Sequence, residues 1–368
     1  MSKNVVLCCD GTANEFAPDR TNVVKLYYAL VQDPTRQVVS YHPGLGTMEA
    51  PGALTGIAKR VTKLAGLAFG AGLERDVRDA YVYLMNNFED GDRVYMFGFS
   101  RGAYTVRAVA SLLKMYGLLP RGNEPFVPYA VRMLNAVNSA SEKGDREASF
   151  DLASEFRETF DKAGRCRPHF VGVWDTVSSV GWVENQLRLP YSTSNPDIAH
   201  GRHAVALDER RAFFRTNFWW PGRTPEDTGP KDLKQVWFPG VHCDVGGGYP
   251  ESQSALSKLP LKWMMDEAAN LQLIFDDERR ATVLGDRGGK HVKPDGTASA
   301  HESLTGWWWP AEFLWKRHYD RSSALEGRRM NLGRRRSFPP KPSIHRSAYE
   351  RGEDYASRLP EDAVVVDG

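Results

Sequence analysis

Residues 93–115 read RVYMFGFSRGAYTVRAVASLLKM and combine, in that order, a strand pattern, a tight-turn pattern and a helix pattern. The run 93–99 is rich in valine and aromatic residues, which favour strands. After Ser100, apolar residues recur at positions 103, 106, 109, 110 and 113, the spacing of one helical face. Because strands that alternate with helices build parallel sheets covered on both sides, this stretch predicts an α/β fold.

Gly98 and Gly102 flank Ser100 in the pattern GxSxG. Small residues at both positions let a strained strand-to-helix turn approach its neighbours, and the serine of such a nucleophile elbow is presented for reaction. The alternative is an ordinary helix N-cap, in which the Ser100 hydroxyl binds the first helical amides. The two interpretations differ at Gly102, since only the tight elbow excludes a methyl group there.

The composition is typical of a globular protein, with 368 residues, 41% hydrophobic, 26% charged and a formal net charge of +2. These values exclude a disordered chain and give no indication of a nucleic-acid-binding surface. We predict one domain over residues 1–368, with insertions at about 120–165 and 276–335. The first insertion is expected to be helical, and residues 276–300 to form a flexible loop.

The N-terminal stretch MSKNVVLCCDG has too short an apolar run for a signal peptide, and no segment approaches the ~20 apolar residues of a membrane span. We therefore expect a soluble cytoplasmic protein, unless a specialised secretion system exports it. The four cysteines lack CxxC spacing and are predicted to be reduced core residues, not metal ligands: Cys8, Cys9, Cys166 and Cys243.

Strand and helix patterns alternate along the whole chain, which predicts a mostly parallel sheet flanked by helices. The predicted strands are 4–9, 37–41, 93–99, 169–174 and 234–241. The predicted helices are 21–31, 72–88, the segment after Ser100, and 256–273. In such a sheet, catalytic groups are expected on the loops at the carboxyl ends of the strands.

Each predicted strand is followed by a side chain that can carry chemistry. The five strands lead into Asp10, His42, Ser100, Asp175 and His242, in that order. The last three follow the chain order Ser, Asp, His, which is the order of the triad in α/β-hydrolases. In a triad the histidine removes the serine proton, and the carboxylate orients the ring and stabilises its cation.

Six segments between residues 3 and 361 resemble a known family: CDGTANE, GFSRGAY, GVWDTVSSVG, RHAVALDERR, WFPGVHCDVGGGY and IHRSAYERGEDYASRLPE. The family is an uncharacterised α/β-hydrolase family that includes the phospholipase effectors of bacterial type VI secretion. The resemblance implies an α/β-hydrolase-like fold with helical insertions, with RHAVALDERR as a helix. It also implies that Ser100, Asp175 and His242 form a triad, and that the substrate is a phospholipid or another acyl lipid.

Several residues compete for the second and third triad positions. Asp175 is alternatively a loop-capping residue. For the base, the main competitor of His242 is His345, in the IHRS segment, and His42 and His203 remain open. Asp244, two residues after His242, is an alternative orienting carboxylate, but it is expected to organise the glycine turn that follows it.

An acyl-transfer site also needs amide donors for the developing oxyanion. The Arg101 amide, directly after the serine, is the expected first donor. The loop Asp10-Gly11-Thr12 is the expected second source, with the Asp10 side chain holding the loop amides in place. The alternative for this loop is a plain Asx-type turn.

The stretch VVLCCDGT is also similar to the DxDGT motif of phosphatases that use an aspartyl nucleophile and magnesium. In that motif the nucleophile lies two residues before the DGT aspartate, and here this position is Cys8. Phosphoryl transfer by that route would lack its attacking carboxylate. We therefore expect no metal and no other cofactor.

Two aromatic clusters, 213–220 and 307–315, are expected mainly to pack an inserted subdomain, with contact to a lipid surface as the alternative. The basic run 333–342 is expected to be a solvated loop. Together these observations predict a serine esterase or lipase that cleaves small-molecule or lipid esters through an acyl-enzyme. The alternative from another class is a non-catalytic binding protein on a hydrolase scaffold.

Overall fold

The computed structural model describes residues 2–11, 20–44, 70–143, 146–161, 166–177, 181–182, 185–186, 189–212, 214–220, 229–313, 315–320 and 325–367. Thr12, a predicted contributor of an oxyanion amide, lies outside these residues. So does Phe213, the first residue of one aromatic cluster.

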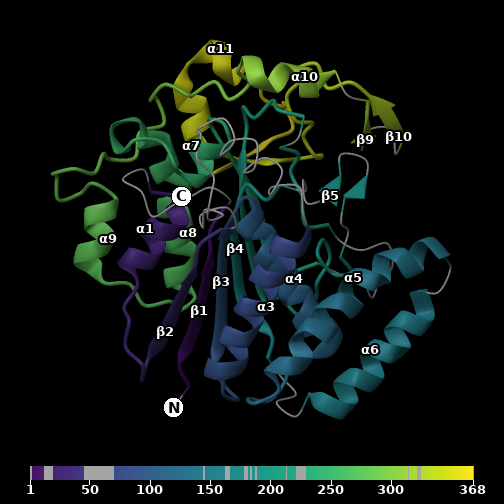
Figure 1. Cartoon of the computed structure of the whole chain (residues 1–368). Helices are drawn as coiled ribbons and strands as arrows, with labels where there is room; N and C mark the ends of the chain where they lie inside the picture. The colour runs from purple at the N-terminus through teal and green to yellow at the C-terminus, as the bar shows by residue number, and fades with distance from the viewer. Residues whose placement is uncertain are drawn as a thin grey trace, which may run out of the picture.

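The centre of the fold is an eight-stranded sheet in which all paired strands run parallel (Figure 1). The strand order across the sheet is β12-β11-β8-β7-β4-β3-β1-β2. The predicted parallel α/β architecture is therefore confirmed. The strands are β1 (Asn4–Cys9), β2 (Gln37–His42), β3 (Arg93–Phe99), β4 (Pro168–Trp174), β7 (His200–Ala206), β8 (Asp232–Phe238), β11 (Ser343–His345) and β12 (Val364–Val366).

Helices cover both faces of the sheet (Figure 1). The helices α3, α4, α5 and α6 pack on one face, and α1, α8 and α9 on the other. The helices are α1 (Asn22–Ala29), α3 (Gly70–Asn87), α4 (Arg101–Tyr116), α5 (Val127–Lys143), α6 (Arg146–Phe160), α7 (His242–Gly246), α8 (Ala255–Asn270), α9 (Asp277–Val283), α10 (Trp309–Glu312) and α11 (Glu353–Ala356).

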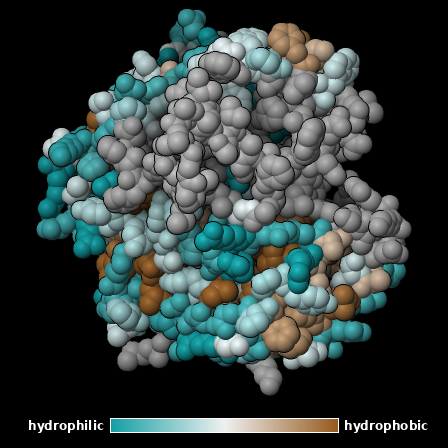
Figure 2. All heavy atoms as spheres, viewed as in Figure 1, coloured by the Kyte–Doolittle hydropathy of each residue, from teal (hydrophilic) through white to brown (hydrophobic). Residues whose placement is uncertain are grey.

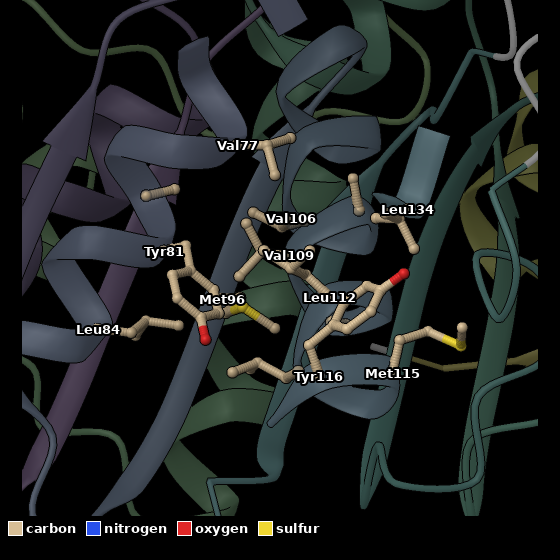
Figure 3. Close-up of a cluster of buried hydrophobic side chains, with 14 of the residues drawn as sticks. Val77, Tyr81, Leu84, Met96, Val106, Val109, Leu112, Met115, Tyr116 and Leu134 are labelled. Carbon is tan, nitrogen blue, oxygen red and sulfur yellow. The ribbon is translucent and has the colours of Figure 1, made fainter. Parts of the chain in front are cut away.

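Successive side chains of a strand enter different cores, because strand residues alternate between the two faces. In β1, Val5 and Leu7 join the cluster under α3 and α4, whereas Val6 and Cys8 join the cluster under α1 and α8. Figure 3 shows the first cluster, in which Tyr81 of α3 and Val109 of α4 lie over Met96 of β3. Burial on both faces explains why β1 reads as an unbroken apolar run after Asn4.

The structure corrects the prediction for RHAVALDERR. Residues 200–206 form β7, which pairs with β4 and β8, and not a helix. Alanine, leucine and arginine favour helices in isolation, but hydrogen bonds to a strand on each side outweigh that local preference. The next strand is also displaced, since β8 ends at Phe238 and not at residue 241.

The first insertion contains helices, as predicted. The short helix η1 (Glu124–Phe126) leads into α5, and α6 follows it. The flexible loop predicted for 276–300 is wrong at its start, where Asp276 caps α9 by accepting a hydrogen bond from the Arg279 amide.

The rest of the chain adds short elements around the carboxyl edge of the sheet. Two small hairpins pair β5 with β6 and β9 with β10. The remaining bounds are β5 (Gly181–Trp182), β6 (Asn185–Gln186), β9 (Lys316–Asp320), β10 (Leu325–Arg329), η2 (Glu251–Gln253), η3 (Gly306–Trp308) and η4 (Arg346–Arg351).

The C-terminal residues belong to the same sheet. Ile344 of β11 and Ala348 of η4 are buried against Val205 of β7 and Trp237 of β8. This third apolar cluster fixes residues 343–367 to the edge of the main sheet.

Among the helices of the described segments, none has both the length and the apolar character needed to cross a bilayer.

Candidate active site

Ser100 lies on the turn between β3 and α4 with φ 56° and ψ −116°. Positive φ is rare for a residue with a Cβ, so the turn holds Ser100 in a strained conformation. The Ser100 amide donates to the Trp174 carbonyl at 3.1 Å, which ties the turn to the end of β4. The hydroxyl makes no capping hydrogen bond to α4, so the alternative of an ordinary N-cap serine is wrong.

The glycines beside Ser100 are in backbone contact with neighbouring elements. A Cβ on Gly102 would lie 2.1 Å from the Cys9 carbonyl oxygen, and one on Gly98 would lie 2.5 Å from the Gly102 carbonyl oxygen. Both distances are far below van der Waals contact, and the obstructing atoms are backbone. The local structure around the turn therefore requires glycine at both positions.

His242 and Asp175 meet at the carboxyl ends of the strands. The His242 Nδ1 atom lies 2.6 Å from Asp175 Oδ2, and both side chains are almost fully buried. An ionised carboxylate only accepts, so Nδ1 carries the hydrogen and Nε2 is the ring atom left to take a proton. The Phe99 ring packs on the His242 ring at 4.6 Å, which brings the residue before Ser100 against the imidazole.

Burial lowers the pKa of His242, while the hydrogen bond to Asp175 raises it in part. The Phe214 ring, 4.8 Å from the imidazole, closes a second side of it. The neutral ring is therefore favoured, which is the form that a general base needs.

Arg336 forms a two-point ion pair with Asp175, at 2.5 Å to Oδ1 and 2.9 Å to Oδ2. The run 333–342, predicted to be a solvated loop, is therefore partly buried. Arg334 and Arg335 are exposed, but the Arg336 side chain is only 9% exposed. The sequence could not reveal this contact, because its partners lie 161 positions apart in the chain.

Glu209 is a second residue beside His242 that no sequence pattern indicates. Its side chain is completely buried and accepts from the His242 amide at 3.2 Å. Arg211 and Ser303 donate to the same carboxylate. Burial would raise the pKa of Glu209, but the Arg211 guanidinium lowers it to about 2. The ionised Glu209 therefore anchors the start of α7, where His242 lies.

The competing histidines have other partners. The His345 Nδ1 atom accepts from the Ser347 amide and caps η4. The His203 Nε2 atom accepts from the Thr176 amide, and the His42 ring lies 3.0 Å from the Ser40 hydroxyl. Of the four candidates, only His242 contacts Asp175 in the described residues.

Asp244 does not serve His242. Its carboxylate contacts the Val241 amide at 3.0 Å and the His301 ring at 2.6 Å. The His301 ring in turn stacks on Tyr249 at 3.6 Å. Asp244 therefore joins the start of α7 to residue 301, whereas its predicted role in the glycine turn after it stays a prediction.

The predicted oxyanion loop follows β1. The Gly11 amide donates to Asp10 Oδ1 at 2.7 Å, and the Thr21 and Tyr41 hydroxyls donate to Asp10 Oδ2. Asp10 thus holds the start of this loop. The Gly11 amide is thus engaged by Asp10, and the role predicted for this loop in binding an oxyanion stays a prediction.

The described residues contain no group of three histidine, cysteine or acidic side chains that could hold a metal ion. Cys8, which stands where the phosphatase motif has its nucleophile, is fully buried, and burial raises the pKa of its thiol. A protonated, enclosed thiol is a poor nucleophile.

The two aromatic clusters differ in burial. Trp219 is buried, in agreement with a packing role. In the second cluster Trp309, Phe313 and Trp315 are 40%, 54% and 61% exposed. Figure 2 shows apolar side chains on the upper rim, where Figure 1 places α10. The second cluster therefore leaves an aromatic surface uncovered in the described structure.

Comparisons with known proteins found the following similarities. One relative is the uncharacterized protein YEL023C of Saccharomyces cerevisiae, 37% identical over 220 residues, which are 58% of this chain and 32% of that protein. Among solved structures, an uncharacterized protein from Pseudomonas aeruginosa has a TM-score of 0.45 at 20% identity, covering 79% of this chain and 49% of that chain. A Tle1 effector bound to the VgrG spike of the type 6 secretion system has a TM-score of 0.35 at 17% identity, covering 69% and 52%.

The chain spans about a third of the length of the yeast relative and about half of each of the two solved chains. A family model described as the type VI secretion phospholipase effector Tle1-like catalytic domain matches residues 3–267. This match covers most of the chain, including Ser100, Asp175 and His242. The chain therefore belongs to the family of Tle1-like phospholipase effector catalytic domains.

Proposed function

We propose that the protein is a serine hydrolase that cleaves the carboxylic ester bonds of lipids, with Ser100 as nucleophile, His242 as base and Asp175 as orienting carboxylate. The observation that carries the proposal is the strained turn at Ser100, whose preceding residue Phe99 packs on the ring of the buried His242–Asp175 pair. A nucleophile on a positive-φ turn, a neutral imidazole with one ring nitrogen fixed, and a buried carboxylate are the parts that acyl transfer needs.

In the proposed reaction, His242 Nε2 takes the hydroxyl proton while Ser100 Oγ bonds to the ester carbonyl carbon. The Arg101 amide stabilises the oxyanion, and the start of α4 adds the positive end of its dipole. The carbon–oxygen bond to the alcohol then breaks, and the alcohol leaves with the proton from His242. Water repeats the sequence on the acyl-enzyme and releases the fatty acid.

The lipid substrate is supported by the family to which the chain belongs. A line of aromatic rings also runs from the site toward the exposed surface of α10. The Phe214 ring lies 4.8 Å from His242 and 5.4 Å from Trp308. Exposed aromatic rings beside a hydrolytic site favour contact with a lipid surface. We propose that Phe313 and Trp315 make this peripheral contact.

A fluorophosphonate probe, followed by mapping of the labelled peptide, tests the chemistry. We expect labelling at Ser100, loss of labelling in Ser100→Ala, and loss of fatty-acid release from phospholipids and short-chain esters in the same variant. A folded wild-type protein that does not label would instead support the alternative of a non-catalytic binding protein.

The lipid contact is tested by sedimentation with vesicles of phosphatidylcholine and phosphatidylglycerol, in a Ser100→Ala background that prevents hydrolysis. Phe313→Ser and Trp315→Ser should each reduce the bound fraction. Leu152→Ser is a matched control, since Leu152 of α6 is 48% exposed and lies in the helical insertion. Equal binding by the control and the two test variants would contradict the proposed contact.

A further inference from the structure

Arg336 lies in the segment after the β9–β10 hairpin, outside residues 3–267 that match the family model. Its guanidinium is nonetheless at the centre of the candidate site. Besides Asp175, it donates to the Ala206 carbonyl at 3.2 Å and to the Phe214 carbonyl. The C-terminal quarter of the chain therefore supplies a cation to a site whose other charged groups come from the family-matched part.

The Asp175 carboxylate is saturated by four donors. Oδ1 accepts from the Ala206 amide at 3.0 Å and from Arg336, and Oδ2 accepts from His242 and from Arg336. Asp175 itself has φ 39°, so its backbone is also held in an unusual conformation. Two of the four donor bonds come from a single planar guanidinium, which fixes the plane of the carboxylate.

We propose that Arg336 is a positioning residue of the active site, which holds the Asp175 carboxylate toward His242 and sets the pH range in which His242 works as a base. This inference rests on the proposed function of Ser100, Asp175 and His242. Arg336 acts through Asp175, and it also fixes the Phe214 backbone, whose ring packs on the imidazole. Arg336 thus positions both the Asp175 carboxylate and the Phe214 ring, and each of these contacts the His242 ring.

The charges around His242 determine the direction of the effect. Asp175 contacts its Nδ1 atom, Glu209 accepts from its amide, Arg211 binds Glu209, and Arg336 shares Oδ2 of Asp175 with the imidazole. The carboxylates favour a protonated ring and the two guanidiniums oppose it. Arg336 therefore keeps His242 neutral, and available as a base, at a lower pH than Asp175 alone would allow.

Arg336 also keeps Asp175 ionised. Burial alone would raise the pKa of Asp175, but the Arg336 guanidinium and His242 hold it well below its usual range. Without Arg336, the buried Asp175 carboxylate would rely on a protonated His242 for its counter-charge, so His242 would keep its proton up to a higher pH.

Ester kinetics across pH test the proposal with three variants. We expect Arg336→Gln to lower kcat on the order of 10- to 100-fold with KM within about twofold, because misplaced catalytic groups slow the chemical step. Its acid limb of kcat/KM should move up by about one pH unit, since the opposing positive charge is gone. Arg336→Lys keeps the positive charge but cannot contact both Asp175 oxygens as the planar guanidinium does. It should therefore keep the acid limb of the wild-type pH profile and lower kcat.

Arg334→Gln is the matched control, because Arg334 belongs to the same arginine run but is exposed. It should behave as wild type in both kcat and pH profile. A merely structural role for Arg336 predicts a lower melting temperature with an unchanged acid limb. That result, or Arg336 variants with wild-type kcat, would overturn the proposal while leaving the hydrolase function intact.

A second measurement does not depend on catalysis. In a Ser100→Ala background, the His242 ring is titrated by NMR with and without Arg336→Gln. We expect the His242 pKa to be higher in the double variant, even if the protein hydrolyses no ester at all. An unchanged His242 pKa in a folded double variant would refute the role assigned to Arg336, whatever the outcome for the proposed function.

Discussion

His242 and His345 differ in what their Nδ1 atoms contact. In His242 this atom faces the Asp175 carboxylate, whereas in His345 it accepts from the Ser347 amide and so carries no hydrogen. We therefore expect His242→Ala to reduce turnover of a p-nitrophenyl ester by roughly 10³-fold or more. His345→Ala should retain turnover and cost about 1 kcal/mol of stability through the lost helix cap.

Steady-state kinetics and thermal melting of both variants check this prediction. The melting temperature of His242→Ala should stay within a few degrees of wild type. Loss of turnover in His345→Ala, with normal turnover in His242→Ala, would mean that the base has been assigned to the wrong histidine.

Burial also makes the stability of the protein depend on pH. It lowers the pKa of His345 to about 4 and that of His203 to about 3. The unfolded chain, with histidine pKa values near 6.5, binds more protons than the native state below that pH. The unfolding free energy contributed by each histidine therefore falls as the pH drops from about 6.5, by up to ~1.4 kcal/mol per pH unit.

Urea denaturation of wild type and His345→Asn between pH 6.5 and 5 measures the pH-dependent part of the unfolding free energy that comes from His345. Asparagine keeps a helix-capping acceptor but does not titrate. Asp76 changes the stability in the opposite direction, because burial raises its pKa to about 7. Both proteins contain Asp76, so its effect cancels when their losses of stability are compared. The loss of stability between pH 6.5 and 5 should be smaller in His345→Asn, and equal losses would contradict the argument.

At the scale of elements, the turn from β3 into α4 has a testable steric requirement. A helix interior ordinarily gains roughly 0.5–1 kcal/mol when alanine replaces glycine. At Gly102 the added methyl group would lie 2.1 Å from the Cys9 carbonyl oxygen, so β1 or α4 must move. We expect Gly102→Ala to destabilise the fold by about 2 kcal/mol or more, and to abolish probe labelling at Ser100.

Chemical denaturation and fluorophosphonate labelling measure the two effects. Gly306→Ala is the matched control, because no atom lies within 4 Å of a Cβ built at Gly306. It should be neutral or slightly stabilising. A Gly102→Ala protein that is more stable than wild type and labels fully would show that no tight elbow exists at Ser100.

The elements also show which parts of the fold the sequence can predict. β1 and β3 are buried on both faces, so their apolar runs are continuous and easily recognised. The helix that the resemblance implies at β7 is wrong: its residues favour helices locally, but pairing with strands distant in the sequence decides its structure. Position at the strand ends is enough to propose Ser100, Asp175 and His242 as candidates, whereas Glu209 and Arg336 join them through contacts that no local pattern encodes.

At the scale of the whole molecule, the candidate site includes residues from beyond the part of the chain that matches the family model. The match ends at residue 267, but Arg336, Ser303 and β11 follow it. β11 pairs with β8, and its Ile344 side chain is buried in the third apolar cluster. Removal of this region would expose a strand edge and leave Asp175 without its cation.

We therefore expect a chain that ends at residue 330 to aggregate or to lack cooperative unfolding, and not to label at Ser100. A chain that ends at residue 360 is the control, since it loses only the last, largely exposed strand, in which Val364 and Val365 are 49% and 47% exposed. This shorter deletion should unfold cooperatively and label like the full chain. If the chain ending at 330 also unfolds cooperatively and labels at the full rate, the family-matched core is sufficient for the chemistry, and the C-terminal region only modulates it.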